Sequence, residues 1–140
     1  MQLQDALAFL ADRRHGVLVT LKADGRPQLS NVAYDLAEGV VRISVTDSRA
    51  KTANLRRDER ASLHVARDDF YAYAVVEGRA ELTPVAADPD DATVDELVEL
   101  YRAVAGEHPA WSEFRQSMVD DGRLVVRLHP ERAYGMLPPS

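Results

Sequence analysis

Short runs in which apolar and polar residues alternate constrain the fold of this chain more than any other feature. The run VVRISVT at residues 40–46 places Val41, Ile43 and Val45 on one face and polar side chains on the other. Such period-two alternation is typical of a half-buried β-strand. Similar runs recur along the chain, so we expect a mainly β fold with some helix.

Turn residues separate these runs and predict how the strands connect. Residues 15–36 predict a hairpin, because two alternating runs flank an Asp-Gly turn. Residues 60–84 predict two further strands, and residues 122–136 predict one or two. About six short antiparallel strands joined in this way favour a small barrel, and the length of the chain favours one domain over residues 1–140.

Four segments with apolar residues at helical spacing accompany the strands. Residues 3–13 predict a short amphipathic helix, and Ser48 is the expected N-cap of a second one. An acidic start at residues 88–91 precedes the clearest helical pattern, which runs to Ala105, and residues 111–119 predict a shorter helix. We expect these helices to cover the ends or the side of the barrel.

The composition excludes several classes of chemistry. The chain has no Cys, which removes disulfides, thiolate metal sites and cysteine nucleophiles. Its four histidines lie too far apart in the sequence to form a local ligand pair, so no metal site is expected. Glycine-rich nucleotide motifs and the G-x-S-x-G nucleophile motif are also missing. Without a signal-like segment or an apolar run of about 20 residues, the chain is expected to be cytoplasmic and without a membrane partner.

A small basic segment interrupts an otherwise acidic chain. The formal net charge is −6, yet residues 47–60 hold five cations and three anions. A local basic patch on an acidic body favours a small anionic ligand over nucleic acid, whose affinity depends on neutralising many phosphates.

The basic segment begins with two cations at the start of the predicted second helix. Arg49 and Lys51 stand where the helix dipole and unpaired N–H groups are already positive, which is unfavourable without an anion. A phosphate placed there would make the arrangement favourable, and Thr52 and Asn54 add short polar side chains nearby. The alternative is a solvated basic helix that is balanced by its own carboxylates.

Small polar residues on two predicted strands form the other candidate feature. The segment GRPQLSNVAY carries Gln28, Ser30 and Asn31 at positions where core strands carry aliphatic residues. With Ser44 and Thr46 of the neighbouring strand, they predict a polar-edged slot for a flat ring. The alternative is a strand whose outer face is simply exposed to water.

These segments occur together in an order that identifies a family. GRPQLSNVAY, SRAKTANLRRDERASLHV, YAYAVVEGRAELTP and DELVELYRAVAGEHPAW follow one another along the chain. In this combination the chain resembles the split β-barrel flavin and deazaflavin oxidoreductase superfamily that includes pyridoxamine-5′-phosphate oxidase. Within it, the chain is most similar to the coenzyme F420-dependent reductase group, over residues 15–136.

The resemblance implies a homodimer of six-stranded split barrels, of the FMN-binding split-barrel type, with a cofactor in the groove between subunits. It implies that Arg49 and Lys51 hold the cofactor phosphate, with Thr52 and Asn54 adjacent. The ring would lie along two strand segments, and residues at the start of the fifth predicted strand would face the site from the same or the partner subunit. The strand and aromatic residues implied are Gln28, Leu29, Ser30, Asn31, Ser44, Val45, Thr46, Tyr71, Tyr73 and Ala74.

The activity that the resemblance implies is hydride transfer from reduced coenzyme F420 to an unsaturated small-molecule acceptor, such as a biliverdin, a quinone or an enone. No residue is identified as catalytic, and the proton is expected to come from solvent. Two alternatives stay open: an FMN-dependent enzyme like pyridoxamine-phosphate oxidase, and a non-enzymatic carrier of a flavin or a tetrapyrrole. The oxidase activity itself is disfavoured, because the C-terminal segment HPERAYGMLPPS lacks the Arg-rich tail of those oxidases.

Overall fold

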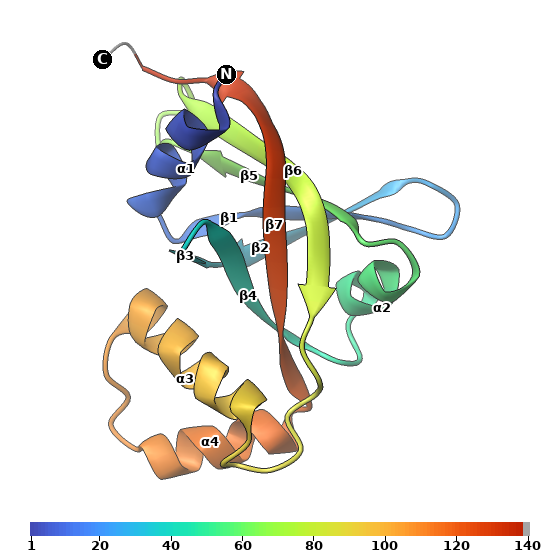
Figure 1. Cartoon of the computed structure of the whole chain (residues 1–140), viewed down its shortest axis with the longest axis vertical. Coiled ribbons are helices and arrows are strands. Elements are labelled where there is room, and N and C mark those ends of the chain that lie inside the picture. The colour runs from blue at the N-terminus through green and yellow to red at the C-terminus, as the bar shows by residue number, and fades with distance from the viewer. Residues whose placement is uncertain (139–140) are drawn as a thin grey trace.

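Seven antiparallel strands form one curled sheet in the computed structural model, which describes residues 1–138. The strands run in the order β2-β1-β5-β6-β7-β4-β3, and the curl brings β2 towards β4, so that the sheet closes into a split barrel (Figure 1). Their bounds are β1 (His15–Leu21), β2 (Pro27–Ala33), β3 (Asp35–Ala37), β4 (Val40–Thr46), β5 (Arg60–Ala66), β6 (Tyr73–Leu82) and β7 (Arg123–Met136).

The split barrel that the sequence predicts is confirmed, with one strand more than expected. The additional strand is β3, which has only three residues and pairs with β4 across the turn at Glu38 and Gly39. So short a run carries no alternation that a pattern could reveal. The C-terminal segment forms a single 14-residue strand, which pairs with β6 and β4 and shows a register shift opposite Glu77 and Gly78.

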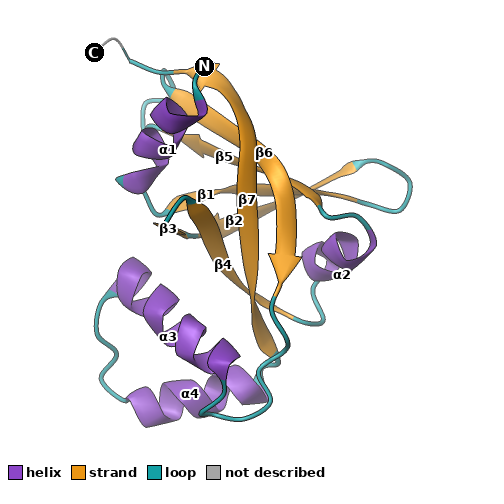
Figure 2. Ribbon diagram, viewed as in Figure 1, coloured by secondary structure: helices purple, strands orange, loops and turns teal. Residues whose placement is uncertain are grey.

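Four helices flank the sheet (Figure 2). The helix α1 covers one end of the barrel, α2 lies beside the β1–β2 hairpin, and α3 and α4 pack together next to β4 and β7. Within residues 1–138, none of these helices has the length and apolar character needed to cross a bilayer. Their bounds are α1 (Leu3–Ala11), α2 (Ala50–Arg57), α3 (Ala92–Ala105) and α4 (Trp111–Asp120).

Two apolar clusters hold these layers together. Val41, Ile43 and Val45 of β4 point into the barrel core as their alternation predicts, and all three are buried. The opposite face of β4 and β7 carries the second cluster, in which Leu97 of α3 and Phe114 of α4 pack over the strands. The helix pair therefore lies outside the barrel, against the polar side of β4.

The start of α2 differs from the prediction by one residue. Arg49, and not Ser48, is the N-cap: its backbone is extended, its carbonyl accepts the N–H groups of Thr52 and Ala53, and no side chain caps the helix. Arg49 is therefore the residue through which the chain enters the helix. The predicted capping role of Ser48 is wrong because the turn after β4 is one residue longer than the prediction assumed.

Candidate functional site

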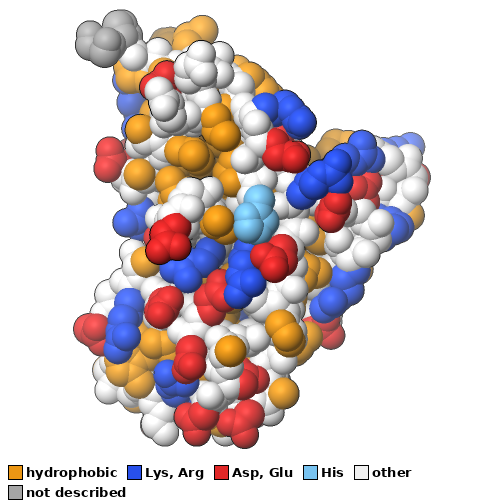
Figure 3. Space-filling model, viewed as in Figure 1, with side chains coloured by type: hydrophobic (Ala, Val, Ile, Leu, Met, Phe, Trp, Pro, Cys, Tyr) orange, Lys and Arg blue, Asp and Glu red, His pale blue; other side chains and the backbone are white. Residues whose placement is uncertain are grey.

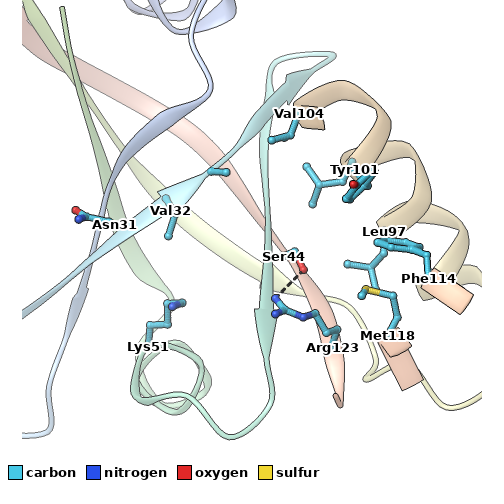
Figure 4. Close-up of a pocket in the computed structure, with 12 residues that line it drawn as sticks. Asn31, Val32, Ser44, Lys51, Leu97, Tyr101, Val104, Phe114, Met118 and Arg123 are labelled. Carbon is cyan, nitrogen blue, oxygen red and sulfur yellow. Dashed lines mark hydrogen bonds between the residues drawn. The ribbon is translucent and has the colours of Figure 1, made fainter. Parts of the chain in front are cut away.

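A cavity of about 400 Å³ lies where the barrel is split. Its walls come from the edge of β2, the outer face of β4, the start of α2 and the pair α3–α4 (Figure 4). Segments far apart in the sequence thus meet around one space. The residues that line it are Asn31, Val32, Ala33, Ser44, Lys51, Leu97, Leu100, Tyr101, Val104, Phe114, Met118 and Arg123.

The two sides of the cavity differ in chemistry. The helices present aliphatic and aromatic side chains, whereas the strands and α2 present Asn31, Ser44, Lys51 and Arg123 (Figure 4). A concave site with an apolar wall and a few convergent polar groups is typical of small-molecule binding. The polar groups can orient a ligand, and the apolar wall can bury a flat body.

The apolar wall is braced by an aromatic cluster. The Tyr101 ring packs against the rings of Phe114 and Trp111 with centroids 5.0 and 5.8 Å apart, and His108 packs against all three rings at 5.3–5.7 Å. The His108 Nδ1 accepts a hydrogen bond of 2.9 Å from the Ala110 N–H, which fixes its orientation between α3 and α4. Tilted and edge-on ring contacts of this kind stabilise one arrangement of the wall.

The polar floor contains unpaired cations at the start of α2. Over the described chain, the Arg49 and Lys51 side chains have no carboxylate within ion-pair distance, and the Ala50 and Lys51 N–H groups have no acceptor. Burial lowers the pKa of the Lys51 ammonium, and the nearby charges of Arg49 and Arg123 lower it further. The protein has therefore gathered three positive side chains, and the carboxylate at ion-pair distance from them in the described chain is that of Asp121, 3.9 Å from the Arg123 Nε.

Thr52 and Asn54 lie beside this floor but turn away from the cavity. The Thr52 hydroxyl donates to the Thr46 carbonyl at 2.7 Å, and the Asn54 amide donates to the Thr20 hydroxyl at 3.1 Å. Both side chains are buried, and Asn54 also accepts a hydrogen bond from Arg57. Their partners are in the protein, so they anchor α2 to the barrel and do not line the cavity as the sequence suggested.

Of the strand residues predicted for the site, Asn31 and Ser44 line the cavity. Gln28 and Ser30 sit opposite Thr20 and Leu18 in the β1–β2 pairing, on the side of β2 that faces the barrel. Leu29 is 59% exposed on the outer face of the sheet. Two predicted residues of β4 also lie elsewhere: the Val45 side chain is in the barrel core, and Thr46 supplies its carbonyl to Thr52.

The three predicted residues before and within β6 do not line the cavity of their own subunit. Tyr71 is 79% exposed in the turn that precedes β6, and Tyr73 lies half-buried on the outer face beside His64, with ring centroids 5.5 Å apart. Ala74 is buried in the barrel core. Tyr71 and Tyr73 are therefore accessible from outside the barrel, and Ala74 is not.

Sequence reasoning missed Arg123 and the helical wall. Arg123 opens β7, and only the β4–β7 register, which pairs Thr46 with Arg123, brings it beside α2. The apolar spacing of α3 and α4 was visible, but the same spacing serves any helix packed on a sheet. The sequence therefore predicted the helices but not that they line a cavity.

The residues present fit a ligand that combines an oxyanion with a flat apolar body. Arg123 lines the cavity, and one of its terminal nitrogens donates to the Ser44 hydroxyl at 3.2 Å, so the guanidinium reaches the cavity floor. The donor set is cationic and rich in N–H groups, as oxyanions require. In the described part of the chain, no group of three or more His, Asp or Glu side chains is placed to bind a metal ion.

The curled sheet, split between β2 and β4 and covered there by a helix pair, defines a split β-barrel protein. The chain belongs to the pyridoxamine 5′-phosphate oxidase family, whose profile matches residues 3–137. The resemblance that the sequence motifs suggested is confirmed at this level.

Solved structures with the same fold differ in what they bind. An F420 reductase is 26% identical, with a TM-score of 0.64 over 90% of this chain and 94% of that one. A heme binding protein from Mycobacterium smegmatis is 25% identical, with a TM-score of 0.70 over 96% of this chain and 53% of that one. A conserved hypothetical protein from Mycobacterium tuberculosis is 23% identical, with a TM-score of 0.76 over 100% of this chain and 91% of that one. At this identity the similarity supports the fold and nothing further.

Proposed function

We propose that this protein is a coenzyme F420-dependent oxidoreductase that reduces an unsaturated small-molecule acceptor. The observation that carries the proposal is the pair of cations Lys51 and Arg123 at the polar end of an apolar-walled cavity. Arg49 is not among the lining residues, but its charge is close enough to lower the pKa of Lys51. A deazaflavin cofactor has both matching parts, a phosphate and a flat ring. Similarity to an F420 reductase at 26% identity supports this choice of cofactor.

The residues of the chain have distinct tasks in this proposal. Arg49 and Lys51 bind the phosphate with the N–H groups at the start of α2, because a helix N-terminus and two cations together favour an anion. Asn31 and Ser44 offer hydrogen bonds to the polar edge of a ring. Tyr101 and the rest of the helical wall exclude water from the opposite side and leave room for an acceptor.

When bound, the reduced deazaflavin supplies a hydride, and solvent supplies the proton that completes the reduction. The contribution of the protein is to hold donor and acceptor in contact in a site from which water is excluded. Quinones and conjugated enones suit the apolar wall, and tetrapyrroles such as biliverdin are a further acceptor class for a turnover screen.

Flavin mononucleotide is the second candidate cofactor. It shares the phosphate and the tricyclic ring, so the cavity of about 400 Å³ with its cationic floor favours it for the same physical reasons. A carrier of a flavin or tetrapyrrole, without turnover, is the remaining alternative, and similarity to a heme binding protein gives it support.

Fluorescence titration separates these candidates. The purified protein is titrated into coenzyme F420 and into flavin mononucleotide, and quenching of each cofactor is followed; a heme titration is followed by absorbance. We expect tight binding of the deazaflavin and turnover of at least one acceptor when the reduced cofactor is supplied. Tight binding of flavin mononucleotide or heme with no binding of the deazaflavin would overturn the proposal.

We further propose that the protein forms a homodimer through the outer face of its sheet. Leu29, Phe70, Tyr71, Tyr134 and Met136 are large apolar side chains exposed on this face or at its rim. Monomeric proteins rarely leave so large an apolar patch in water. A partner packed there would bring Tyr71 and Tyr73 close to a second cavity.

Light scattering after size-exclusion chromatography tests the dimer. The expected mass is twice the 15.5 kDa of the chain. Leu29→Ser combined with Tyr134→Ser should shift the protein towards the monomer and weaken cofactor binding together. A clean monomer in the unchanged protein would exclude any contribution of Tyr71 or Tyr73 to a site on another subunit.

A further inference from the structure

Arg123 is brought to the cavity floor by strand register and by a turn. It pairs across from Thr46, the last residue of β4, and follows Gly122, whose carbonyl accepts the Asp47 N–H at 2.9 Å. The φ of +64° at Gly122 is in the region that favours glycine, so the turn into β7 is tightly specified. The first residue of β7 is thereby fixed beside the segment that leads into α2.

The Arg123 side chain is only partly satisfied by the protein. One terminal nitrogen donates to the Ser44 hydroxyl at 3.2 Å, which directs the guanidinium towards the cavity (Figure 4). The Nε is buried and has no hydrogen-bond partner among the described residues. The nearest carboxylate, on Asp121, lies 3.9 Å from Nε, too far for a hydrogen bond, and the side chain is 33% exposed.

A buried arginine nitrogen without a partner does not by itself indicate a ligand. The Arg42 Nε is also buried and unpaired, but the terminal nitrogens of Arg42 meet carboxylates of Asp35 and Glu99 at 2.9 and 3.5 Å. Arg123 has no carboxylate at such a distance in the described structure. The difference is therefore one of degree, because Arg42 meets two carboxylates at 3.5 Å or less, whereas the carboxylate near Arg123 lies 3.9 Å away and is half exposed.

Arg123 also acts on Lys51. Its charge is among the causes that lower the pKa of the Lys51 ammonium, after burial and Arg49. Figure 4 shows both side chains reaching the cavity floor, Lys51 from α2 and Arg123 from β7, with the Arg123 guanidinium bonded to Ser44 of β4. Two like charges held near each other at the edge of one cavity are unfavourable until an anion joins them.

We infer that Arg123 is a third ligand for the anion, and that the site is a phosphate clamp closed by two elements distant in sequence. Lys51 and Arg49 bind from the start of α2, and Arg123 binds from the start of β7 with a terminal guanidinium nitrogen, while Ser44 positions the guanidinium. A phosphate group suits this clamp because it has several oxygens, each able to accept from a different cation. The inference deepens the proposed function, since it adds a binding residue to the same site.

The test uses the cofactor-free protein and inorganic phosphate. The chain has two lysines, Lys22 and Lys51, so lysine-labelled protein gives one NMR signal for the site and one internal reference. In Arg123→Gln, we expect the pKa of Lys51 to rise towards its ordinary value and that of Lys22 to stay unchanged. Phosphate affinity should fall about tenfold, as expected for the loss of a charged hydrogen bond.

Two further variants serve as controls. Arg123→Lys retains the charge and should recover part of the phosphate affinity, and it keeps the test valid if Arg123→Gln folds poorly. Arg102→Gln removes an arginine from the outer surface of α3, where it pairs with Glu107 at 3.1 Å, and should change neither the Lys51 pKa nor phosphate binding.

The outcomes separate this inference from the proposed function. If Lys51→Ala weakens deazaflavin binding while Arg123→Gln leaves phosphate affinity within about twofold, the clamp is wrong and the cofactor assignment stands. If phosphate binding requires Arg123 but no deazaflavin binds, the clamp stands and the cofactor assignment fails. An unchanged Lys51 pKa in Arg123→Gln would also overturn the clamp.

Discussion

Two clusters of arginines in this protein have opposite relations to their surroundings. Between α3 and the barrel, Arg42 and Arg127 lie among the carboxylates of Asp35, Glu96 and Glu99, at the seam that holds the helix pair in place. At the cavity floor, Arg49 and Arg123 lie beside Lys51 with no carboxylate at hydrogen-bond distance in the described chain. Figure 3 shows acidic and basic side chains interspersed over the middle of the visible face.

The pKa values follow this difference. Burial alone would lower the pKa of Arg42, but hydrogen bonding to Asp35 and the charges of Asp35 and Glu96 raise it above its ordinary value. Hydrogen bonding to Glu96 raises the pKa of Arg127 in the same way. The pKa of Lys51 moves the other way, since its neighbours are cations. The seam is balanced by carboxylates of the chain, whereas the floor keeps an excess of positive charge.

The largest effect is expected from breaking the seam. Glu96 is 14% exposed, accepts two hydrogen bonds from Arg127 and lies 3.9 Å from Arg42. Glu96→Gln keeps the shape but removes the charge, so two partly buried guanidinium groups lose a counter-ion. The free energy of unfolding should fall by about 3 kcal/mol, measured by urea denaturation.

The matched control is Asp68→Asn, in the exposed turn between β5 and β6. Asp68 itself forms no ion pair within the described structure, although its neighbours Arg67 and Asp69 pair at 3.0 Å. Its effect should stay within about 0.5 kcal/mol. If Glu96→Gln lowered the free energy of unfolding by no more than this control, the seam would behave as a surface salt-bridge network. The contrast in stability between the seam and the cavity floor would then be wrong.

The next effect is on binding and not on stability. Lys51→Ala removes the half-buried cation at the floor, and affinity for the deazaflavin should fall about 10- to 100-fold, as for a charge-assisted hydrogen bond. Thermal stability should stay the same or rise slightly, since repulsion from Arg49 and Arg123 is relieved. Cofactor fluorescence and a melting curve measure the two quantities, and unchanged affinity would remove the phosphate role of Lys51.

Helix starts offer a smaller version of the same contrast. The Asp91 carboxylate caps α3, accepting from the N–H groups of Val94, Ala87 and Asp88 at 2.8–3.1 Å, whereas no side chain caps α2. Asp91→Ala should cost about 1–2 kcal/mol of stability, and Ser48→Ala less than about 0.5 kcal/mol. A cost of 1 kcal/mol or more for Ser48→Ala in thermal melts would restore Ser48 as the cap.

The sequence could predict what depends on local pattern. Alternation identified the buried face of β4, and the Asp-Gly turn identified the β1–β2 hairpin. It could not predict what depends on register. The pairing between strands decides whether Arg123 reaches the cavity and on which side of β2 the Gln28 side chain lies. A shift of one residue in that pairing would move each side chain to the opposite face of the sheet.

The family resemblance had a corresponding limit. It identified segments near a cofactor, but it did not say which side chains in them point outward. Thr52, Asn54 and Val45 lie in the implied segments, yet their side chains are buried among protein partners. Those three residues affect the site indirectly, through the backbone and the position of α2. A sequence motif does not distinguish such an indirect role from direct contact with a ligand.

The smallest effect is a pH dependence that only the unpaired cluster should show. In the anion-free protein the pKa of Lys51 lies below its ordinary 10.5, so the unfolded chain holds this proton more tightly. Stability without phosphate should therefore rise slightly as the pH increases through the window between the two pKa values. A bound phosphate raises the pKa of Lys51, so phosphate affinity should fall over the same range.

The second ionisation of inorganic phosphate is about half complete at neutral pH and is complete roughly two pH units higher, so a decline above that point would come from the protein. Phosphate titrations from that point up to the ordinary lysine pKa of 10.5 should show it in the unchanged protein and not in Lys51→Ala. Glu96→Gln, which alters only the seam, should retain the decline in full. A decline that persisted without Lys51 would mean that the floor is not where the phosphate binds.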